Sequence, residues 1–317
     1  MLRSVLARLG IFVASLLAAS LVIFVITQAL PGDVAAAILG FGATPEQLAA
    51  KRAELGTDRP FLIQYADWIG GVLHGDFGRS WYSDIPVATL IAPRLEVTSS
   101  LVLLGLALAL VIALPLGAVA ALERRQWQGF TTSALAQFGM AIPAFWAGIL
   151  LVFVFAVTLR WFPANGYSPL ARGLGPWASH LVLPVVALGA VQGAVLIRYV
   201  RSAFLEVLGE DYYRTARSIG WTRWRALARH GVRNAALSLV TVLGLQLATV
   251  IVGAIVIERV FVLPGLGSLL LDMVGRHDLI VVRGVVLLLV FVVLLINAAV
   301  DISYALIDPR LRTSGRA

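Results

Sequence analysis

The stretch LEVLGEDYYRTARSIGWTRWRALARHGVR, residues 205–233, decides the fold, because it is the longest polar run between two apolar blocks. Each of those blocks is long enough to cross a bilayer. The stretch carries six arginines, which are Arg214, Arg217, Arg223, Arg225, Arg229 and Arg233. A segment this polar between two spans is expected to lie at a membrane face, and the rest of the chain is expected to hold it there.

The residues of this stretch predict two short helices joined at a glycine. Asp211 can cap the first helix by accepting a backbone N–H bond, and Gly220 can end it in the left-handed conformation. Thr222 can cap the second helix in the same way. The polar run is therefore expected to fold as a compact helical turn.

The first of these helices is expected to have an apolar face and a cationic face. Tyr212, Ala216 and Ile219 follow each other at spacings of four and three residues, so they share one side. Arg214 and Arg217 point elsewhere. A short helix of this kind suits docking into a groove on a protein partner. The alternative is an interfacial loop whose arginines contact lipid headgroups.

Composition places the chain among polytopic membrane proteins. Its 317 residues are 60% hydrophobic and 13% charged, with a mean hydropathy of +0.91, which exceeds what a water-soluble domain needs. There is no cysteine, so disulfides and thiolate metal sites are excluded. The net charge of +8 comes almost wholly from arginine, and its asymmetry across the predicted membrane argues against nucleic-acid binding.

Six apolar runs are each long enough to span a bilayer at about 1.5 Å per residue. They cover residues 9–30, 97–122, 130–159, 181–200, 235–257 and 279–305. The first could instead be a signal-peptide core, but it is long for one and lacks a convincing cleavage site, so a retained span is expected. In the third run, Ile142-Pro143 is expected to kink the helix. Loops are expected over residues 160–179 and 258–278.

A region of mixed polarity follows the first run and extends to about Pro93. Thr44, Pro45 and Gln47 predict a helix start with a capping box, and Gly56 is expected to end that helix. The region is either a small soluble cap or a pair of helices resting at the membrane interface.

A second amphipathic helix is predicted over residues 61–73, with aromatic residues on one side, and residues 75–80 are expected to form a turn. The aromatic residues favour contact with the membrane or with a subunit. The chain is thus expected to divide into an N-terminal region (1–93), a core of five helices (94–306) and a tail (307–317).

The distribution of arginines predicts the orientation. With both termini in the cytoplasm, the inner segments carry 15 basic and 5 acidic residues, and the outer segments carry 10 basic and 11 acidic residues. Asp301 lies near the inner end of the last run. This asymmetry places the arginine stretch in the cytoplasm and the region before Pro93 outside.

The segment TARSIG, residues 215–220, resembles the EAA loop of ABC-importer permeases, and YRTARSIG…RHGVRNA resembles the form in the dipeptide and oligopeptide permease family. Ala216 and Gly220 keep the general pattern. Arg214 replaces its glutamate and Thr215 its first alanine, as is common in the peptide branch. Similarity continues through ATPEQLAAKRAELGTDRPFLIQY, GDFGRS, IPAFW, VFVLPGLGSLLLDMV and DISYALIDPR, so it covers nearly the whole chain.

This resemblance implies an all-α membrane protein with six transmembrane helices, the type I ABC importer permease fold and an extracytoplasmic region after the first helix. It implies a second homologous permease, two ATP-binding subunits or domains and an extracytoplasmic substrate-binding protein, in a bacterial cytoplasmic (inner) membrane. ATP and magnesium would belong to the partner subunits. Relatives carry dipeptides, oligopeptides, glutathione or nickel complexes, so the choice among these substrates is left open.

The resemblance also implies an element that couples the ATPases to the spans. The residues expected to form it are Asp211, Tyr212, Tyr213, Arg214, Thr215, Ala216, Arg217, Gly220 and Trp221. Ala216 is expected to permit close approach and Gly220 to make the turn. Arg214 and Arg217 are expected to supply polar contacts.

The sequence carries no signature of an enzyme. A P-loop needs Gly-Lys followed by Ser or Thr, and the only lysine lies in Ala50-Lys51-Arg52. The four histidines lack ligands at helical spacing, and no Gly-x-Ser-x-Gly or His-Glu-x-x-His motif occurs. A transporter subunit whose partners hydrolyse ATP is therefore expected, with no metal and no cofactor of its own.

Polar side chains within the apolar runs are candidates for a translocation path. The residues expected to offer hydrogen bonds to a polar solute are Gln137, Gln192, Gln246 and Asn297. The alternative for each amide is a hydrogen bond between helices. No charged residue lies in the middle of a run, which argues against a proton-coupled carrier. A stand-alone channel or carrier and a scaffold in membrane assembly are the alternatives from other classes.

Overall fold

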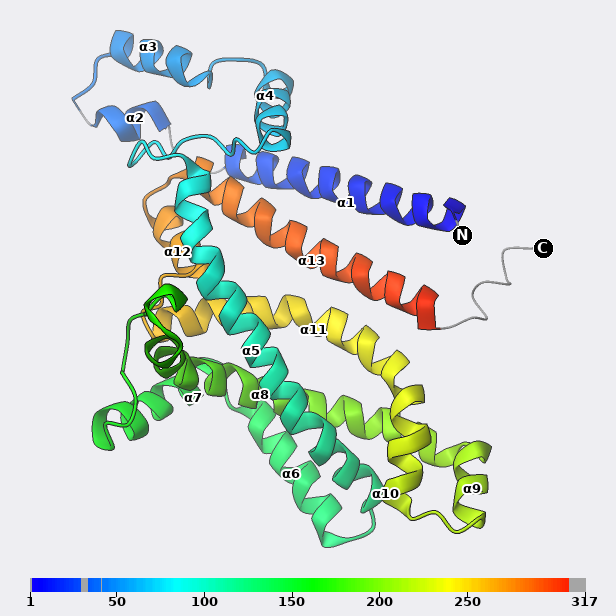
Figure 1. The fold of residues 1–317 in the computed structure, drawn as a ribbon. Helices are drawn as coiled ribbons and strands as arrows, with labels where there is room; N and C mark the ends of the chain where they lie inside the picture. Colours follow the sequence, from blue (N-terminus) through cyan, green and yellow to red (C-terminus); the bar gives the residue numbers. More distant parts are fainter. Residues whose placement is uncertain (1, 30–33, 41, 308–317) are drawn as a thin grey trace. The chain divides into compact units, whose positions relative to one another are not determined.

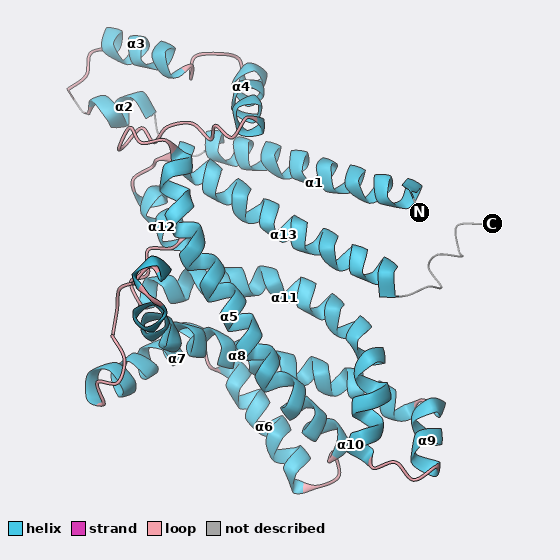
Figure 2. Ribbon diagram, viewed as in Figure 1, coloured by secondary structure: helices cyan, strands magenta, loops and turns pink. Residues whose placement is uncertain are grey.

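The computed structural model describes residues 2–29, 34–40 and 42–307, which form helices joined by loops and turns (Figure 1). Over these residues no strand forms, and the one β-type contact is an isolated bridge between Arg79 and Pro86 (Figure 2). The predicted all-α class is therefore confirmed. Most of the predicted tail, residues 308–317, and the side chain of Asp301 lie outside the described part.

Within the described part, five helices are long and apolar enough to cross a membrane. They are α1 (Leu2–Ala29), α5 (Val87–Leu122), α8 (Leu174–Gly209), α11 (Val232–Val260) and α13 (Leu279–Ile307). A bent pair can supply a sixth span. It consists of α6 (Trp127–Ala141) and α7 (Ala144–Leu151), which continues as the π-helical segment Val152–Thr158. The predicted number of spans is reached when this pair counts as one.

The third predicted span is broken rather than kinked. Ile142 has extended backbone (φ −85°, ψ 119°), as a residue before proline prefers, and Pro143 precedes α7. The two parts are bent by 95°. The predicted disturbance at Ile142-Pro143 is confirmed, but the continuous kinked helix over residues 130–159 is wrong, because Pro143 has no N–H with which to continue α6.

Several predicted boundaries are wrong because polar and amphipathic turns extend the apolar helices. α5 begins at Val87 instead of residue 97, and α8 spans Leu174–Gly209 instead of 181–200. The predicted loop over residues 258–278 contains the end of α11 and a short helix, α12 (Leu266–Gly275). Leu266 and Leu269 of α12 are buried, so packing stabilises this helix.

The chain forms two compact units. The first comprises residues 1–96 and 265–298, and the second comprises residues 97–264 and 299–317. Each unit has its own apolar core. In the first, one core cluster is formed by Val87, Ile91, Leu266, Leu269, Val281 and Val285.

In the first unit, α2 (Val34–Leu39), α3 (Pro45–Leu55) and α4 (Phe61–Leu73) follow α1. The capping box of α3 is confirmed, since Thr44 Oγ1 accepts from the N–H of Gln47 and Gln47 Oε1 accepts from the N–H of Thr44. Gly56 ends the helix at φ 67°, which is also as predicted.

The aromatic side of α4 packs against α1. Phe24 of α1 is buried, and the ring centroids of Phe61, Tyr65 and Trp68 lie 5.1, 5.5 and 5.7 Å from its own. The predicted aromatic face is therefore confirmed, and part of it is used within the chain itself.

In the second unit, α5 and α8 approach closely through glycines. A Cβ on Gly189 would lie 2.9 Å from the carbonyl oxygen of Gly105, and one on Gly117 would lie 2.5 Å from Cγ1 of Val200. Gly189 and Gly193 of α8 are four residues apart and face α5. Small residues at this spacing let helix backbones meet in a membrane. The two helices thus form a tightly packed pair.

Candidate functional site

The arginine stretch continues α8 to Gly209 and then forms α9 (Asp211–Ser218), a turn and α10 (Arg223–Ala226). Gly220 lies in the turn with φ 92°, so its predicted left-handed conformation is confirmed. Thr222 caps α10, because its hydroxyl accepts from the N–H of Arg225 at 3.3 Å. α9 is thereby set between two helices of the second unit.

The second predicted helix does not stand alone. After α10 a π-helical turn, Leu227–Gly231, leads directly into α11. The predicted start of the fifth span at residue 235 is therefore wrong, because the helical backbone continues from Arg223 onward. The turn at Gly220 is therefore linked through helical segments to α8 on one side and to α11 on the other.

Asp211 does not cap α9. The capping position is Glu210, which makes no side-chain cap bond, and Asp211 is the first residue of the helix. The Asp211 side chain is 97% exposed and lies 3.6 Å from Nη1 of Arg214. A carboxylate in the first turn still complements the positive end of the helix dipole. The prediction of a side-chain cap at Asp211 is wrong, whereas a helix beginning there is confirmed.

The inner face of α9 differs from the predicted one. Tyr213 and Ala216 are buried, whereas Tyr212 is at the edge of exposure and Ile219 is 69% exposed. Ala216 shares the buried side as predicted, but Tyr212 and Ile219 do not. The sequence is ambiguous here, because either of the two adjacent tyrosines can belong to the apolar face of such a short helix. The outer surface of α9 therefore presents Tyr212 and Ile219 beside the arginines.

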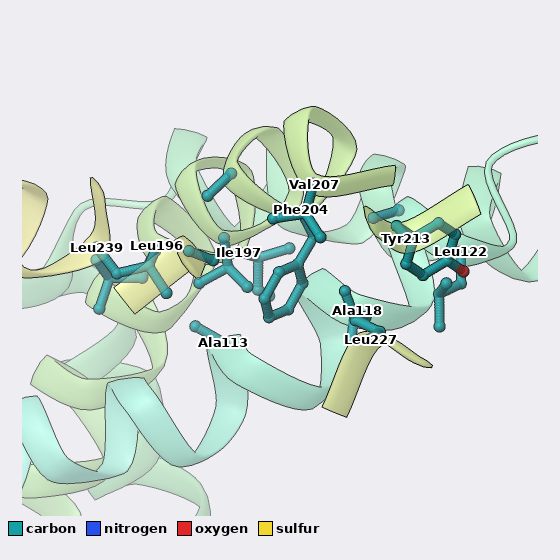
Figure 3. Packing of buried hydrophobic residues seen from close by; sticks show 14 of the residues in the cluster. Ala113, Ala118, Leu122, Leu196, Ile197, Phe204, Val207, Tyr213, Leu227 and Leu239 are labelled. Carbon is teal, nitrogen blue, oxygen red and sulfur yellow. The ribbon is translucent and has the colours of Figure 1, made fainter. Parts of the chain in front are cut away.

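Tyr213 anchors α9 in the core of the second unit. Its ring lies in the same cluster as Leu122 of α5 and Leu227 (Figure 3). The Tyr213 hydroxyl donates to the carbonyl oxygen of Arg223 at 3.4 Å. Burial raises the pKa of this hydroxyl above its usual value, so it stays a protonated donor. α9 is thus fastened to α5 and to the start of α10.

The turn after Gly220 is held by side chains that pack against Trp221. The guanidinium of Arg225 lies 4.7 Å from the centroid of the Trp221 ring, and the His230 ring lies 5.3 Å from it on centroids. Nη1 of Arg217 donates to the carbonyl oxygen of Trp221. These contacts join α9, the turn and the start of α11.

A pocket of about 350 Å³ lies between α9 and the turn that links α5 to α6. Glu123 lines it with one carboxylate oxygen shielded from water and without a hydrogen-bond partner. Nη1 of Arg223 lies 4.0 Å from that oxygen. Gly129 permits the tight turn, because a Cβ there would meet the carbonyl oxygen of Glu123 at 2.3 Å.

In the sequence Glu123 is followed by two arginines, but nothing local connects it to the arginine stretch. The negative charge of Glu123 could have been used as a signal, since a carboxylate among basic residues is expected to pair with a cationic side chain. A second missed pair is Thr98 and Glu258. Both are buried, and the Thr98 hydroxyl donates to Oε1 of Glu258 at 2.6 Å.

The residues expected along a translocation path have different environments. Gln192 of α8 is buried, and its amide oxygen has no hydrogen-bond partner in the described part. Gln137 of α6 is exposed and Gln246 of α11 is half-buried, and both belong to the same unit as Gln192. Asn297 is exposed on α13 in the other unit. No hydrogen bond between described residues joins any two of the four.

Family models match both parts of the chain. Residues 113–313 match the model described as the binding-protein-dependent transport system inner membrane component. Residues 1–102 match the N-terminal model of the same transport system membrane component. Together the two models cover nearly all of the sequence.

Curated relatives are similar over their whole length. A Brucella abortus (strain 2308) protein, provisionally named a peptide transport system permease protein, is 41% identical over 97% of this chain and 98% of its own. The dipeptide transport system permease protein DppB of Escherichia coli (strain K12) is 38% identical over 98% of this chain and 99% of its own.

The fold is also similar to that of a solved ABC transporter. A chain of the MetNI methionine ABC transporter, in an inward-facing conformation, superposes with a TM-score of 0.57 at 21% identity. The match covers 69% of this chain and 96% of the other. This similarity concerns the fold alone, which is that of a type I ABC importer permease.

Proposed function

The chain belongs to the family of binding-protein-dependent transport system inner membrane components, and we propose that it is a permease subunit of an ATP-driven importer of dipeptides or oligopeptides. The observation that carries this proposal is the similarity to peptide permeases over the full length of both chains. Five apolar helices and a bent pair agree with a multi-pass subunit. Import of glutathione or a nickel complex is the alternative within the same family.

The proposed complex contains this chain, a second homologous permease, two ATP-binding subunits or domains and an extracytoplasmic binding protein. Partner subunits hydrolyse the ATP, because the sequence carries no P-loop. The proposed division is an N-terminal region (1–93), a permease core (94–306) and a tail (307–317). Both termini lie in the cytoplasm, where the arginine-rich segments gather.

The segment from Asp211 to Trp221 is the proposed coupling element. α9 follows α8 directly and is joined to α11 through α10, so force applied to it reaches two spans. Its outer surface offers apolar side chains and arginines to a groove on an ATPase. Tyr213 and Ala216 on the inner side transmit the displacement into the core.

Gln192 is the best-supported of the proposed path residues. A buried amide oxygen that receives no hydrogen bond from a donor destabilises the fold. The presence of Gln192 at this buried position therefore favours a function. A passing peptide can supply the missing donor through a backbone N–H. Gln137, Gln246 and Asn297 are proposed more broadly as polar groups along or beside the path.

Co-purification from mild detergent tests the proposal. The expected result is a complex with a second permease and two ATP-binding domains, with ATPase activity stimulated by a binding protein. Ile219→Asp, on the outer surface of α9, should release the ATP-binding domains. Leu174→Asp is the matched control, because Leu174 is 72% exposed at the opposite end of α8. A chain that purifies alone and moves solute in liposomes would instead be a channel or a carrier.

A further inference from the structure

A pocket of about 440 Å³ lies in the first unit, where the end of α1 and the start of α13 meet α4 and the turn that follows it. The helices α1 and α13 run antiparallel here, since Phe12 contacts Phe291 at one end and Thr27 contacts Arg283 at the other (Figure 1). The pocket is therefore at the ends of two candidate spans, well away from their middles.

Arg283 brings a positive charge into this pocket. Its guanidinium carbon lies 4.4 Å from the centroid of the Phe24 ring. Its Nε donates to Oγ1 of Thr27 at 2.6 Å, and its Nη2 donates to Oε1 of Gln28 at 2.9 Å. All three partners are uncharged, and no carboxylate of the described residues forms an ion pair with Arg283. Among the described residues, the side chain is thus held in place without being neutralised.

The other charged side chains that line the pocket each form an ion pair, that of Glu54 with Lys51 outside the lining. Asp67 pairs with Arg59 at 3.1 Å, and Glu54 pairs with Lys51 at 2.7 Å. The charge of Arg283 is therefore what the pocket presents to a ligand. A half-buried guanidinium of this kind is costly unless an anion offsets it.

Two indoles add further donors. Trp68 and Trp81 both line the pocket, and each has its indole N–H shielded from water with no acceptor among the described residues. An indole N–H can only donate. The buried polar atoms of this pocket that lack a partner among the described residues are thus both donors, which suits the oxygens of a phosphate or a carboxylate.

The surface beside the pocket is apolar. The last turns of α1 expose large aliphatic side chains just before Thr27, and these are Leu21, Val22, Val25 and Ile26. On the membrane-spanning part of a helix such a surface is covered by acyl chains. Tryptophans near the ends of spans mark the headgroup level of a bilayer. The two tryptophans line the same pocket as the Arg283 guanidinium, and the aliphatic side chains directly precede its partner Thr27.

We infer that this pocket binds the phosphate of a membrane phospholipid, with Arg283 as its cationic ligand and the acyl chains lying along α1. A free carboxylate, such as the C-terminus of a peptide, would present similar oxygens to Arg283. The continuous aliphatic surface of α1 favours the lipid, because a small peptide has nothing to place there. The site is built from other residues than the proposed coupling segment and differs from it in chemistry.

Native mass spectrometry of the purified complex after graded delipidation tests this inference, with phosphatidylglycerol and phosphatidylethanolamine added back. Arg283→Gln should weaken retention of one phospholipid by about tenfold, the typical effect of losing one charge-assisted bond. Arg276→Gln is the matched control, because Arg276 is exposed and stacks on Tyr82 in the same unit. It should retain the lipid as the unchanged protein does.

Two further arms separate the outcomes. Trp81→Phe keeps the charge and removes one indole N–H, so it should weaken retention in the same direction and stands in if Arg283→Gln does not fold. A dipeptide with a free carboxylate should not displace the lipid, nor should its C-terminal amide. Displacement by the free carboxylate alone, or equal retention in Arg283→Gln and Arg276→Gln, would overturn the phospholipid assignment.

Discussion

Ser80 donates its hydroxyl to Oδ2 of Asp278 at 2.5 Å, across 198 positions of sequence within the first unit. Asp278 is fully buried, and its carboxylate also accepts from the N–H groups of Tyr82 and Val281. The Val281 contact caps the start of α13. One carboxylate therefore fixes both the turn after α4 and the first turn of the last span.

Replacing Asp278 by alanine should destabilise the protein, because it leaves a hydroxyl and two backbone N–H groups without their acceptor. The expected loss is about 2–3 kcal/mol in the free energy of unfolding. Chemical unfolding in detergent, followed by circular dichroism, measures it. Asp58→Ala at an exposed position is the control, and an equal effect of the two changes would contradict the role of this carboxylate.

Gly220→Val should uncouple ATP hydrolysis from transport while the complex still assembles. Nothing lies within 4 Å of a Cβ at Gly220, so the cost comes from its φ of 92°, about 1–2 kcal/mol for a residue with a side chain. ATPase and uptake rates measured in the same proteoliposomes report the effect.

Gly209→Val is the matched control for that experiment. Gly209 lies at the end of α8, also with nothing within 4 Å, but without a left-handed backbone. Gly209→Val should leave the ratio of transport to ATP hydrolysis unchanged. Full transport by Gly220→Val would remove the turn from the coupling mechanism.

Gly189→Ala should destabilise the protein, whereas Gly175→Ala should not. Both lie in α8, but a Cβ at Gly189 would meet the carbonyl oxygen of Gly105 at 2.9 Å, whereas nothing lies near Gly175. The first change should cost about 1–3 kcal/mol through overpacking. The second should be neutral or stabilising by up to about 1 kcal/mol through helix propensity. Thermal unfolding of the two variants distinguishes them, and equal midpoints would contradict close packing of α5 and α8.

Thr98→Val should weaken the link between α5 and α11. The change keeps the shape of the side chain and removes the hydroxyl that donates to buried Glu258. Loss of this donor to the buried carboxylate should lower the free energy of unfolding by about 1–3 kcal/mol. Thr132→Val on α6 is the control, because its partly exposed hydroxyl donates to the carbonyl oxygen of Gln128 within the same helix. Stability measured by chemical unfolding should fall in the first variant alone.

The long helices could be predicted because about 20 consecutive apolar residues have few alternatives to a membrane-spanning helix. Local signals also worked where they act within one turn, as at Thr44, Gly56 and Gly220. Helix ends could not be predicted well, because the helices continue beyond their apolar runs. α5 begins earlier, at Val87, and α8 ends later, at Gly209, and both extensions contain polar residues. α12 was not predicted, because a ten-residue helix is stabilised by packing more than by the helix propensity of its own residues.

The candidate site was predictable as a segment but less so as a set of contacts. Its turn at Gly220 follows from local chemistry, whereas the pairing of Glu123 with Arg223 joins positions 100 residues apart. The buried Tyr213 and the exposed Tyr212 differ only in how α9 is rotated against α8. The glycines of α8 at a spacing of four were visible in the sequence, but their partner helix was not.

The length of α8 has a consequence for assembly. Its 36 residues extend about 54 Å at 1.5 Å per residue, whereas the hydrocarbon core of a bilayer measures about 30 Å. Part of the surplus is the polar end, which carries Arg198, Arg201 and Glu206. In the proposed complex, α8 would be a spacer that holds α9 beyond the lipid headgroups. If an ATP-binding subunit docks on α9 as proposed, the length of α8 sets its distance from the bilayer, and removing one turn would change both the height and the facing direction of the proposed docking surface.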